Sequence, residues 1–260
     1  LFPDTTRFRS GDIASGPWWP RETVRWLMAR AAAEPARWRT IAGNHERQAL
    51  AADIRRMGAS DAFAARQLGP AERAWLGALP AAQWILGDVL LCHGTPATDL
   101  VYFMETVVPG FAVDGQRGIR PAVVDELRVR AAEAAPGDPR PGLAAALIAC
   151  GHTHVPRALA VPGGPRVLNP GSVGLQAYAD DHPLAHVVET GSPDARWALA
   201  ERDRRGAWQL QLRSTPYDTT AAIARARANG RDDWAGALAT GFLDAATQAR
   251  VQGASRRAIS

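Results

Sequence analysis

Residues 147–154 read LIACGHTH, and residues 40–46 read TIAGNHE. In each segment an apolar run passes through a glycine into side chains that can bind a metal ion. An apolar run bounded by glycine predicts a buried strand, and the residues after it lie on a loop held by the sheet. Alternate residues of an extended segment point to one side, which places the imidazoles of His152 and His154 together. These two segments therefore predict a ligand site built on strand ends.

Two more segments, Gly11-Asp12 and His93-Gly94, combine a ligand with a glycine in the same way. Glycine allows unusual backbone angles and a close approach of the backbone to an ion. A single histidine near a strand end is more often structural than a ligand, so we infer a metal site only from the four segments together. Together its carboxylate, amide and imidazole donors suit Mn, Fe, Zn or Ni ions.

In this order the motifs resemble the calcineurin-like metallophosphoesterases, and most of all their small bacterial phosphodiesterase branch. The series is Gly11-Asp12, Gly43-Asn44-His45-Glu46, His93-Gly94, Gly151-His152-Thr153-His154 and the NPGSVG segment at residues 169–174. The later segments Asp180-Asp181-His182 and Tyr217-Asp218 also resemble that branch. The resemblance implies an α/β (α+β) fold, with two packed mixed β-sheets flanked by helices in a four-layer sandwich.

The resemblance also assigns roles to the matching positions. The metal ligands would be Asp12 as the carboxylate that bridges two ions, Asn44, His93 and His152 at the second ion, and His154 at the first. His45 would contact the scissile phosphate and protonate the leaving oxygen, so the catalytic residues would be His45 and Asp12. Glu46 would orient the backbone, while Asn169 and Ser172 would shape the loop beneath the site.

The expected activity is hydrolysis of small phosphoesters, as a phosphodiesterase or phosphatase. Two divalent metal ions, with Mn among the candidates, would bridge a hydroxide that attacks phosphorus in line. Phosphodiesters, nucleotides, dinucleoside polyphosphates and phosphoproteins all remain open as substrates, and so do the metal and the oligomeric state.

The chain departs from the family at its start. The family begins with an Asp-x-His motif whose two residues bind the first ion, and nothing before Gly11 supplies it. The first ion would then keep only Asp12 and His154, fewer than the three protein ligands usual in catalytic sites. Residues 1–10, LFPDTTRFRS, show no helix period or strand alternation and resemble the translation LFPYTTLFRS of a sequencing adapter.

We therefore expect residues 1–10 to be non-native, the first strands to be missing, and activity to be impaired. Residues 11–245 would form one metallophosphoesterase domain, and residues 246–260 a flexible basic tail.

Periodicity predicts mixed helices and strands, followed by a strand meander. The expected helices are 20–33, 45–57, 71–79, two stretches within 97–142 (the second from Pro121), 219–229 and 232–240. The expected strands are 39–42, a hairpin of 83–86 with 89–92, then 143–150, 157–161, 166–168, 184–190, 196–201 and 207–213.

Composition narrows the functional classes. The net charge is +4 and all thirty basic residues are arginine, which excludes Schiff-base lysines and a lysine-containing P-loop. No apolar run approaches the roughly 20 residues of a membrane span. Cys92 and Cys150 end apolar runs without CxxC spacing, which indicates buried thiols and fits a reducing cytoplasm.

Three other interpretations stay open. The chain could be an inactive metal-binding remnant or regulatory scaffold, which metal analysis with a phosphodiester assay would separate from an enzyme. It could be a nucleic-acid-binding module, but the arginines are scattered, and the nine Trp residues are mostly singletons in apolar settings. A mononuclear zinc hydrolase built on His152 and His154 would leave the other motifs unexplained.

Overall fold

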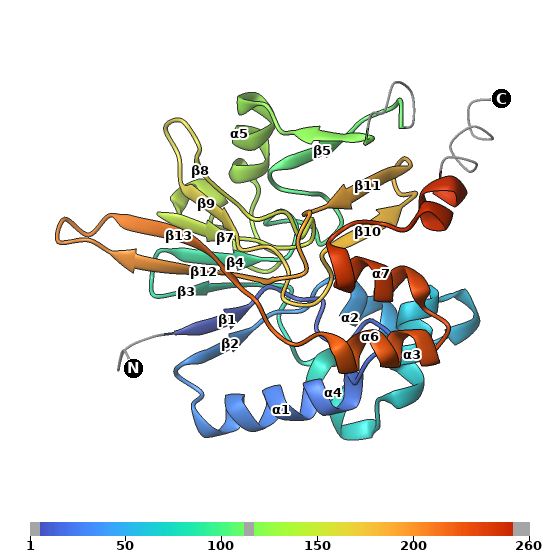
Figure 1. The fold of residues 1–260 in the computed structure, drawn as a ribbon. Helices are drawn as coiled ribbons and strands as arrows, with labels where there is room; N and C mark the ends of the chain where they lie inside the picture. Colours follow the sequence, from blue (N-terminus) through green and yellow to red (C-terminus); the bar gives the residue numbers. More distant parts are fainter. Residues whose placement is uncertain (1–5, 112–116, 252–260) are drawn as a thin grey trace. The chain divides into compact units, whose positions relative to one another are not determined.

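The computed structural model describes residues 6–111 and 117–251 (Figure 1). Two compact units share the chain. Unit 1 comprises Leu1–Val101 with Ala131–His152, and unit 2 comprises Tyr102–Arg130 with Thr153–Ser260. Residues 1–5 of the segment expected to be non-native, and 252–260 of the expected tail, lie outside the described residues. Residues 246–251 of the expected tail are helical.

Unit 1 contains short strands and the helices between them. The strands are β1 (Arg7–Arg9), β2 (Trp38–Thr40), β3 (Ala82–Ile85), β4 (Val89–Cys92) and β7 (Leu147–Ala149). The helices are α1 (Pro20–Ala33), α2 (Asn44–Ala49), α3 (Ala59–Gln67) and α4 (Pro70–Gly77), with 3₁₀ turns η1 (Ile54–Arg56) and η2 (Gly142–Ala144).

Parallel pairing in unit 1 decides where its loops lie. β1 pairs with β2 in parallel, and β4 pairs with β7 in parallel, while β3 and β4 form an antiparallel hairpin. Parallel neighbours end at the same edge of a sheet, so the loops that follow β4 and β7 emerge side by side. The loops after β1 and β2 do the same.

The core of unit 1 follows from its apolar faces. Every residue of β4 and β7 is buried, as expected for strands covered on both sides. α1 begins with a proline in its first turn and buries Val24 and Leu27, which are spaced three residues apart on one face. This helix packs against α3 and α4 (Figure 1).

Unit 2 consists mainly of antiparallel strand pairs. These are β5 (Glu105–Val107) with β6 (Ile119–Pro121), β8 (Arg157–Ala160) with β9 (Arg166–Asn169), β10 (Ala177–Asp180) with β11 (His186–Glu189), and β12 (Ala195–Arg202) with β13 (Trp208–Thr215). Its helices are α5 (Val124–Ala132), which runs two residues into unit 1, α6 (Thr220–Ala228) and α7 (Asp232–Thr240).

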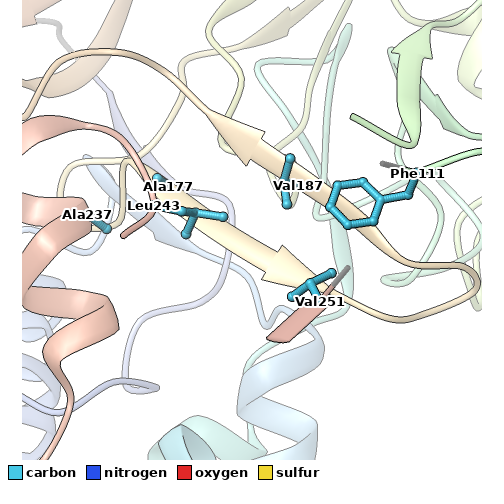
Figure 2. Packing of buried hydrophobic residues seen from close by; sticks show 6 residues of the cluster. All are labelled: Phe111, Ala177, Val187, Ala237, Leu243 and Val251. Carbon is cyan, nitrogen blue, oxygen red and sulfur yellow. The ribbon is translucent and has the colours of Figure 1, made fainter. Parts of the chain in front are cut away.

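A hydrophobic cluster organises the strand pair β10–β11 of unit 2. Figure 2 shows its buried side chains: Phe111, Ala177, Val187, Ala237, Leu243 and Val251. Because Ala237 belongs to α7 and Val251 follows it, the cluster ties the end of the described chain to this strand pair.

Four sequence expectations were wrong in detail. The helix expected at 45–57 is interrupted, because α2 ends at Ala49 and a separate 3₁₀ turn follows after Asp53, whose carboxylate accepts from the Arg55 amide. The first helical stretch expected within 97–142 is instead the β5–β6 strand pair.

The strand expected at 143–150 is shorter, because the 3₁₀ turn η2 occupies its beginning. Residues 7–9, expected to lack strand character, form β1. Their pairing with β2 uses backbone groups and needs no alternating side-chain pattern.

Several sheets flanked by helices confirm the mixed α/β fold class. Within 6–111 and 117–251, no helix is both long and apolar enough to cross a membrane.

Candidate metal centre

The strand ends of unit 1 carry four of the expected ligands. Asp12 follows β1, Asn44 opens α2 just after β2, His93 follows β4 directly, and His152 lies shortly after β7. These residues are far apart in sequence, and the two parallel pairs bring them together.

The side chains meet at donor atoms. One ligand atom each from Asp12, His93 and His152 lies within 4.8 Å of the others. His93 Nε2 lies 3.0 Å from Asn44 Oδ1 and 3.2 Å from Asp12 Oδ2. Two ligand atoms at about 2.0–2.2 Å from one ion lie about 3–3.4 Å apart, so these spacings fit a shared coordination sphere. Carboxylate, amide and imidazole donors fit a divalent transition metal.

The tautomer of His93 is set by its other nitrogen. Its Nδ1 contacts the carbonyl oxygen of Ser10, an acceptor only, so Nδ1 carries the proton and Nε2 faces the donor cluster. Burial lowers the pKa of His93, but the Asp12 carboxylate, the Ser10 carbonyl and the Glu46 carboxylate together outweigh burial and raise that pKa overall. The same concentrated negative charge would attract a cation.

Backbone strain concentrates at the expected ligands. Among the described residues, the non-glycine residues with positive φ are Asp12 (55°), Leu86 (52°), His152 (67°) and His154 (58°). Such conformations are costly for residues with a Cβ and persist where the surroundings hold them, commonly at functional sites. Three of the four are residues to which the family resemblance assigns metal binding.

Glycines allow the loops to approach closely. A Cβ on Gly11, whose φ is 97°, would lie 2.5 Å from the Gly43 amide nitrogen and 2.7 Å from His93 Nδ1. A Cβ on Gly43 would lie 2.5 Å from Asp12 Oδ1. Real Cβ contacts are not this short, so both motifs need glycine here.

Glu46 fastens the loop containing Asp12 to the start of α2. Its buried carboxylate accepts from the amides of Asp12 (2.8 Å), Ile13 (2.7 Å), Ala14 (3.2 Å) and Gly43 (2.8 Å). With its oxygens engaged by backbone amides, Glu46 orients the backbone, which is the role the resemblance implies.

His45 is paired with a carboxylate that the sequence did not reveal. Its Nδ1 lies 2.8 Å from Oδ1 of Asp61, which is buried in the first turn of α3. The His45 side chain is 37% exposed, so part of its ring faces solvent. Burial lowers the pKa of His45, but the carboxylates of Asp12, Asp61 and Glu46 outweigh it and raise that pKa to about 9.

The donor set agrees with the family to which comparison with known proteins assigns the chain. The family model of the calcineurin-like phosphoesterases matches residues 9–156, more than half of the chain. The chain belongs to this family. No curated protein matches the sequence.

Two solved structures share the phosphoesterase fold. A metallophosphoesterase from Sphaerobacter thermophilus is similar with 20% identity and a TM-score of 0.61, over 91% of this chain and 88% of that one. A hypothetical protein from Pyrococcus horikoshii OT3 is similar with 16% identity and a TM-score of 0.62, over 91% and 85%.

His154 of this phosphoesterase belongs to unit 2, where its own surroundings are well defined. Its Nδ1 lies 3.0 Å from the carbonyl oxygen of Leu175, so Nδ1 donates and Nε2 is the nitrogen that could bind a metal ion. The participation of His154 in the same centre as Asp12 stays a prediction from the resemblance.

The loop at residues 169–174 supports His154, as expected for Asn169 and Ser172. Asn169 is buried and donates to the Thr153 hydroxyl at 2.9 Å. Ser172 Oγ accepts from the amide of Leu175 at 3.0 Å, which fixes the residue whose carbonyl binds His154.

Sequence reasoning missed Asp61, because helix α3 was not expected and an aspartate 16 residues after His45 carries no motif. A second group that could hold a cation, Asp180-Asp181-His182, consists of consecutive residues of which the last two are exposed. Cys92 and Cys150 are buried thiols, as predicted.

Proposed function

We propose that this phosphoesterase hydrolyses small phosphodiesters or phosphomonoesters at a centre of two divalent ions. Asp12, Asn44, His93 and His152 would hold one ion, while Asp12 and His154 would contribute to the other. The observation that supports this most directly is the convergence of donor atoms from Asp12, Asn44 and His93 at 3.0–3.2 Å. When bound, such ions neutralise phosphoryl oxygens and lower the pKa of a water molecule.

His45 is the proton donor in this proposal. Asp61 accepts a hydrogen bond from Nδ1, so the imidazolium presents its Nε2 proton away from Asp61. The Asp61 carboxylate is among the groups that raise the pKa of His45, and it favours the protonated ring without taking part in metal binding. A donor with a proton at Nε2 can transfer it to the leaving oxygen as the phosphorus–oxygen bond breaks.

The two ions should differ in affinity. The resemblance assigns only Asp12 and His154 to one of them, whereas catalytic sites ordinarily supply three or more protein ligands. We propose that this ion binds weakly and that turnover of the chain is low without excess metal. Mn, Fe, Zn and Ni are the candidate metals, because the donors are mixed oxygen and nitrogen. The buried thiols Cys92 and Cys150 fit a reducing cytoplasmic setting.

A metal-dependent assay tests the proposal. The EDTA-treated chain should be inactive on bis(4-nitrophenyl) phosphate, regain turnover with added Mn²⁺, and lose it in a His93→Ala variant. Turnover that survives EDTA would contradict the proposal. Tight Mn²⁺ binding without turnover on diesters or monoesters would favour the inactive metal-binding scaffold instead.

A further inference from the structure

A chain of hydrogen bonds in unit 2 joins the buried Tyr102 and His186 to the half-buried Tyr178. His186 is fully buried, and its Nδ1 lies 2.8 Å from the carbonyl oxygen of Leu184. A carbonyl only accepts, so Nδ1 of the neutral ring carries the proton and Nε2 is an acceptor. The Tyr102 hydroxyl, 2.8 Å from Nε2, therefore donates to His186.

The direction of this hydrogen bond determines the direction of the next one. With its proton directed at His186, the Tyr102 oxygen accepts from the hydroxyl of Tyr178, which lies 2.9 Å away. The same Tyr178 proton is shared with the carbonyl oxygen of Thr153, which lies 3.3 Å from the Tyr178 oxygen, in a weaker three-centre hydrogen bond. Thr153 is fully buried, and Asn169 donates to its hydroxyl at 2.9 Å. Backbone and side chain of Thr153 are thus held from two directions.

The ring of Tyr178 also contacts the next residue. The rings of His154 and Tyr178 meet edge to face, with centroids 5.4 Å apart and planes at 71°. His154 has a φ of 58°, a backbone conformation that a non-glycine residue keeps only when its neighbours enforce it. Tyr178 is placed to enforce it, because it contacts both the peptide that precedes His154 and the imidazole ring.

We propose that Tyr178 is a positioning residue that holds His154 in the orientation for binding a metal ion, and that Tyr102 and His186 hold Tyr178 in turn. This inference rests on the proposed function in one respect, the assignment of His154 as a ligand. Residues that orient a metal-bound histidine typically change metal affinity by about 10–100-fold when they are replaced.

The test is a titration of the metal-free chain with Mn²⁺, followed by calorimetry. Wild type should show two classes of Mn²⁺-binding site. The tight class comes from the unit 1 ligands, and the weak class needs His154. Tyr178→Phe should raise the Kd of the weak class about 10-fold or more and leave the tight class unchanged. Tyr178→Leu, which also removes the aromatic ring, should raise the Kd of the weak class further. Tyr217→Phe is the matched control, since it removes a hydroxyl that bonds to the Val173 carbonyl at 3.1 Å.

A double variant shows whether Tyr178 acts through His154. His154→Ala should abolish the weak class, and adding Tyr178→Phe to it should change the tight class no further. A residue that only stabilises the fold would lower the Tm in Tyr178→Phe without a selective change in metal affinity, and that result would overturn the inference. An equal loss of affinity in both classes would overturn it too.

If wild type shows no weak class, the proposed function fails, and a measurement without metal decides the inference. Imidazole ¹⁵N shifts at one fixed pH should show His154 as a single tautomer with the proton on Nδ1 in wild type. Tyr178→Phe should give a mixture of tautomers or broadened signals, while Tyr217→Phe should not. Identical His154 spectra in wild type and Tyr178→Phe would overturn the inference.

Discussion

The imidazole Nδ1 of His45 lies 2.8 Å from the buried carboxylate oxygen of Asp61. The two residues come from different helices, α2 and α3, so the pair holds the His45 ring at a fixed angle to the donor cluster of unit 1. A proton donor so oriented should lose efficiency when its carboxylate partner is neutralised.

Asp61→Asn should lower kcat about 10–100-fold on diesters with alkoxide leaving groups, because general-acid catalysis contributes about 10²–10⁴-fold and the variant weakens it only in part. The loss should be smaller for a 4-nitrophenolate leaving group, which departs without a proton. Steady-state kinetics on both substrates measures the difference. Asp53→Asn, which changes an exposed carboxylate paired with Arg55, is the matched control and should leave both rates unchanged. Equal losses on both substrates would contradict the assignment of His45 as proton donor.

The metal-free chain should show the His45 ring titrating near pH 9. Because this folded-state pKa lies above the ordinary value of 6.5, the pairing stabilises the fold fully below pH 6.5. That contribution is lost as the pH rises through about 9. An NMR titration of the imidazole signals in EDTA measures the midpoint, and Asp61→Asn should move it downward. A midpoint at or below 6.5 in wild type would show that the carboxylates do not act on His45.

Glu46 and Glu72 form a natural comparison. Each is buried at the third position of its helix and accepts from the amide of a preceding glycine, Gly43 or Gly69. Only Glu46 also binds the loop containing Asp12. Glu46→Ala should destabilise the chain by about 2–4 kcal/mol, since it leaves buried amides without a hydrogen-bond acceptor. It should also weaken Mn²⁺ binding.

Glu72→Ala should destabilise the chain less than Glu46→Ala and leave metal affinity intact. Urea unfolding and calorimetry measure the two properties. Unchanged Mn²⁺ affinity in Glu46→Ala would mean that the Asp12 loop holds its position by itself.

Local patterns anticipated the regular elements well. The helices at 20–33 and 232–240 and the hairpin around Gly87-Asp88 follow from apolar spacing, a proline near a helix start and a turn dipeptide. The break after Ala49 and the β5–β6 pair depend on contacts distant in sequence, which a local period does not encode.

The candidate site was predictable as far as its motifs extend. Asp12, Asn44, His93 and His152 each stand beside a glycine or a strand end, and unit 1 brings them together. Asp61 and Tyr178 could not be found this way, because their roles arise from a helix and a strand that the pattern did not indicate. Each was revealed by its contact with a histidine of the motifs.

Anomalous diffraction from crystals of the chain grown with saturating Mn²⁺ tests the central claim most directly. The account predicts a strong peak about 2.0–2.4 Å from the carboxylate of Asp12, the amide oxygen of Asn44 and the imidazoles of His93 and His152. No peak among these four side chains, or a Mn²⁺ peak only at Asp180-Asp181-His182, would contradict it.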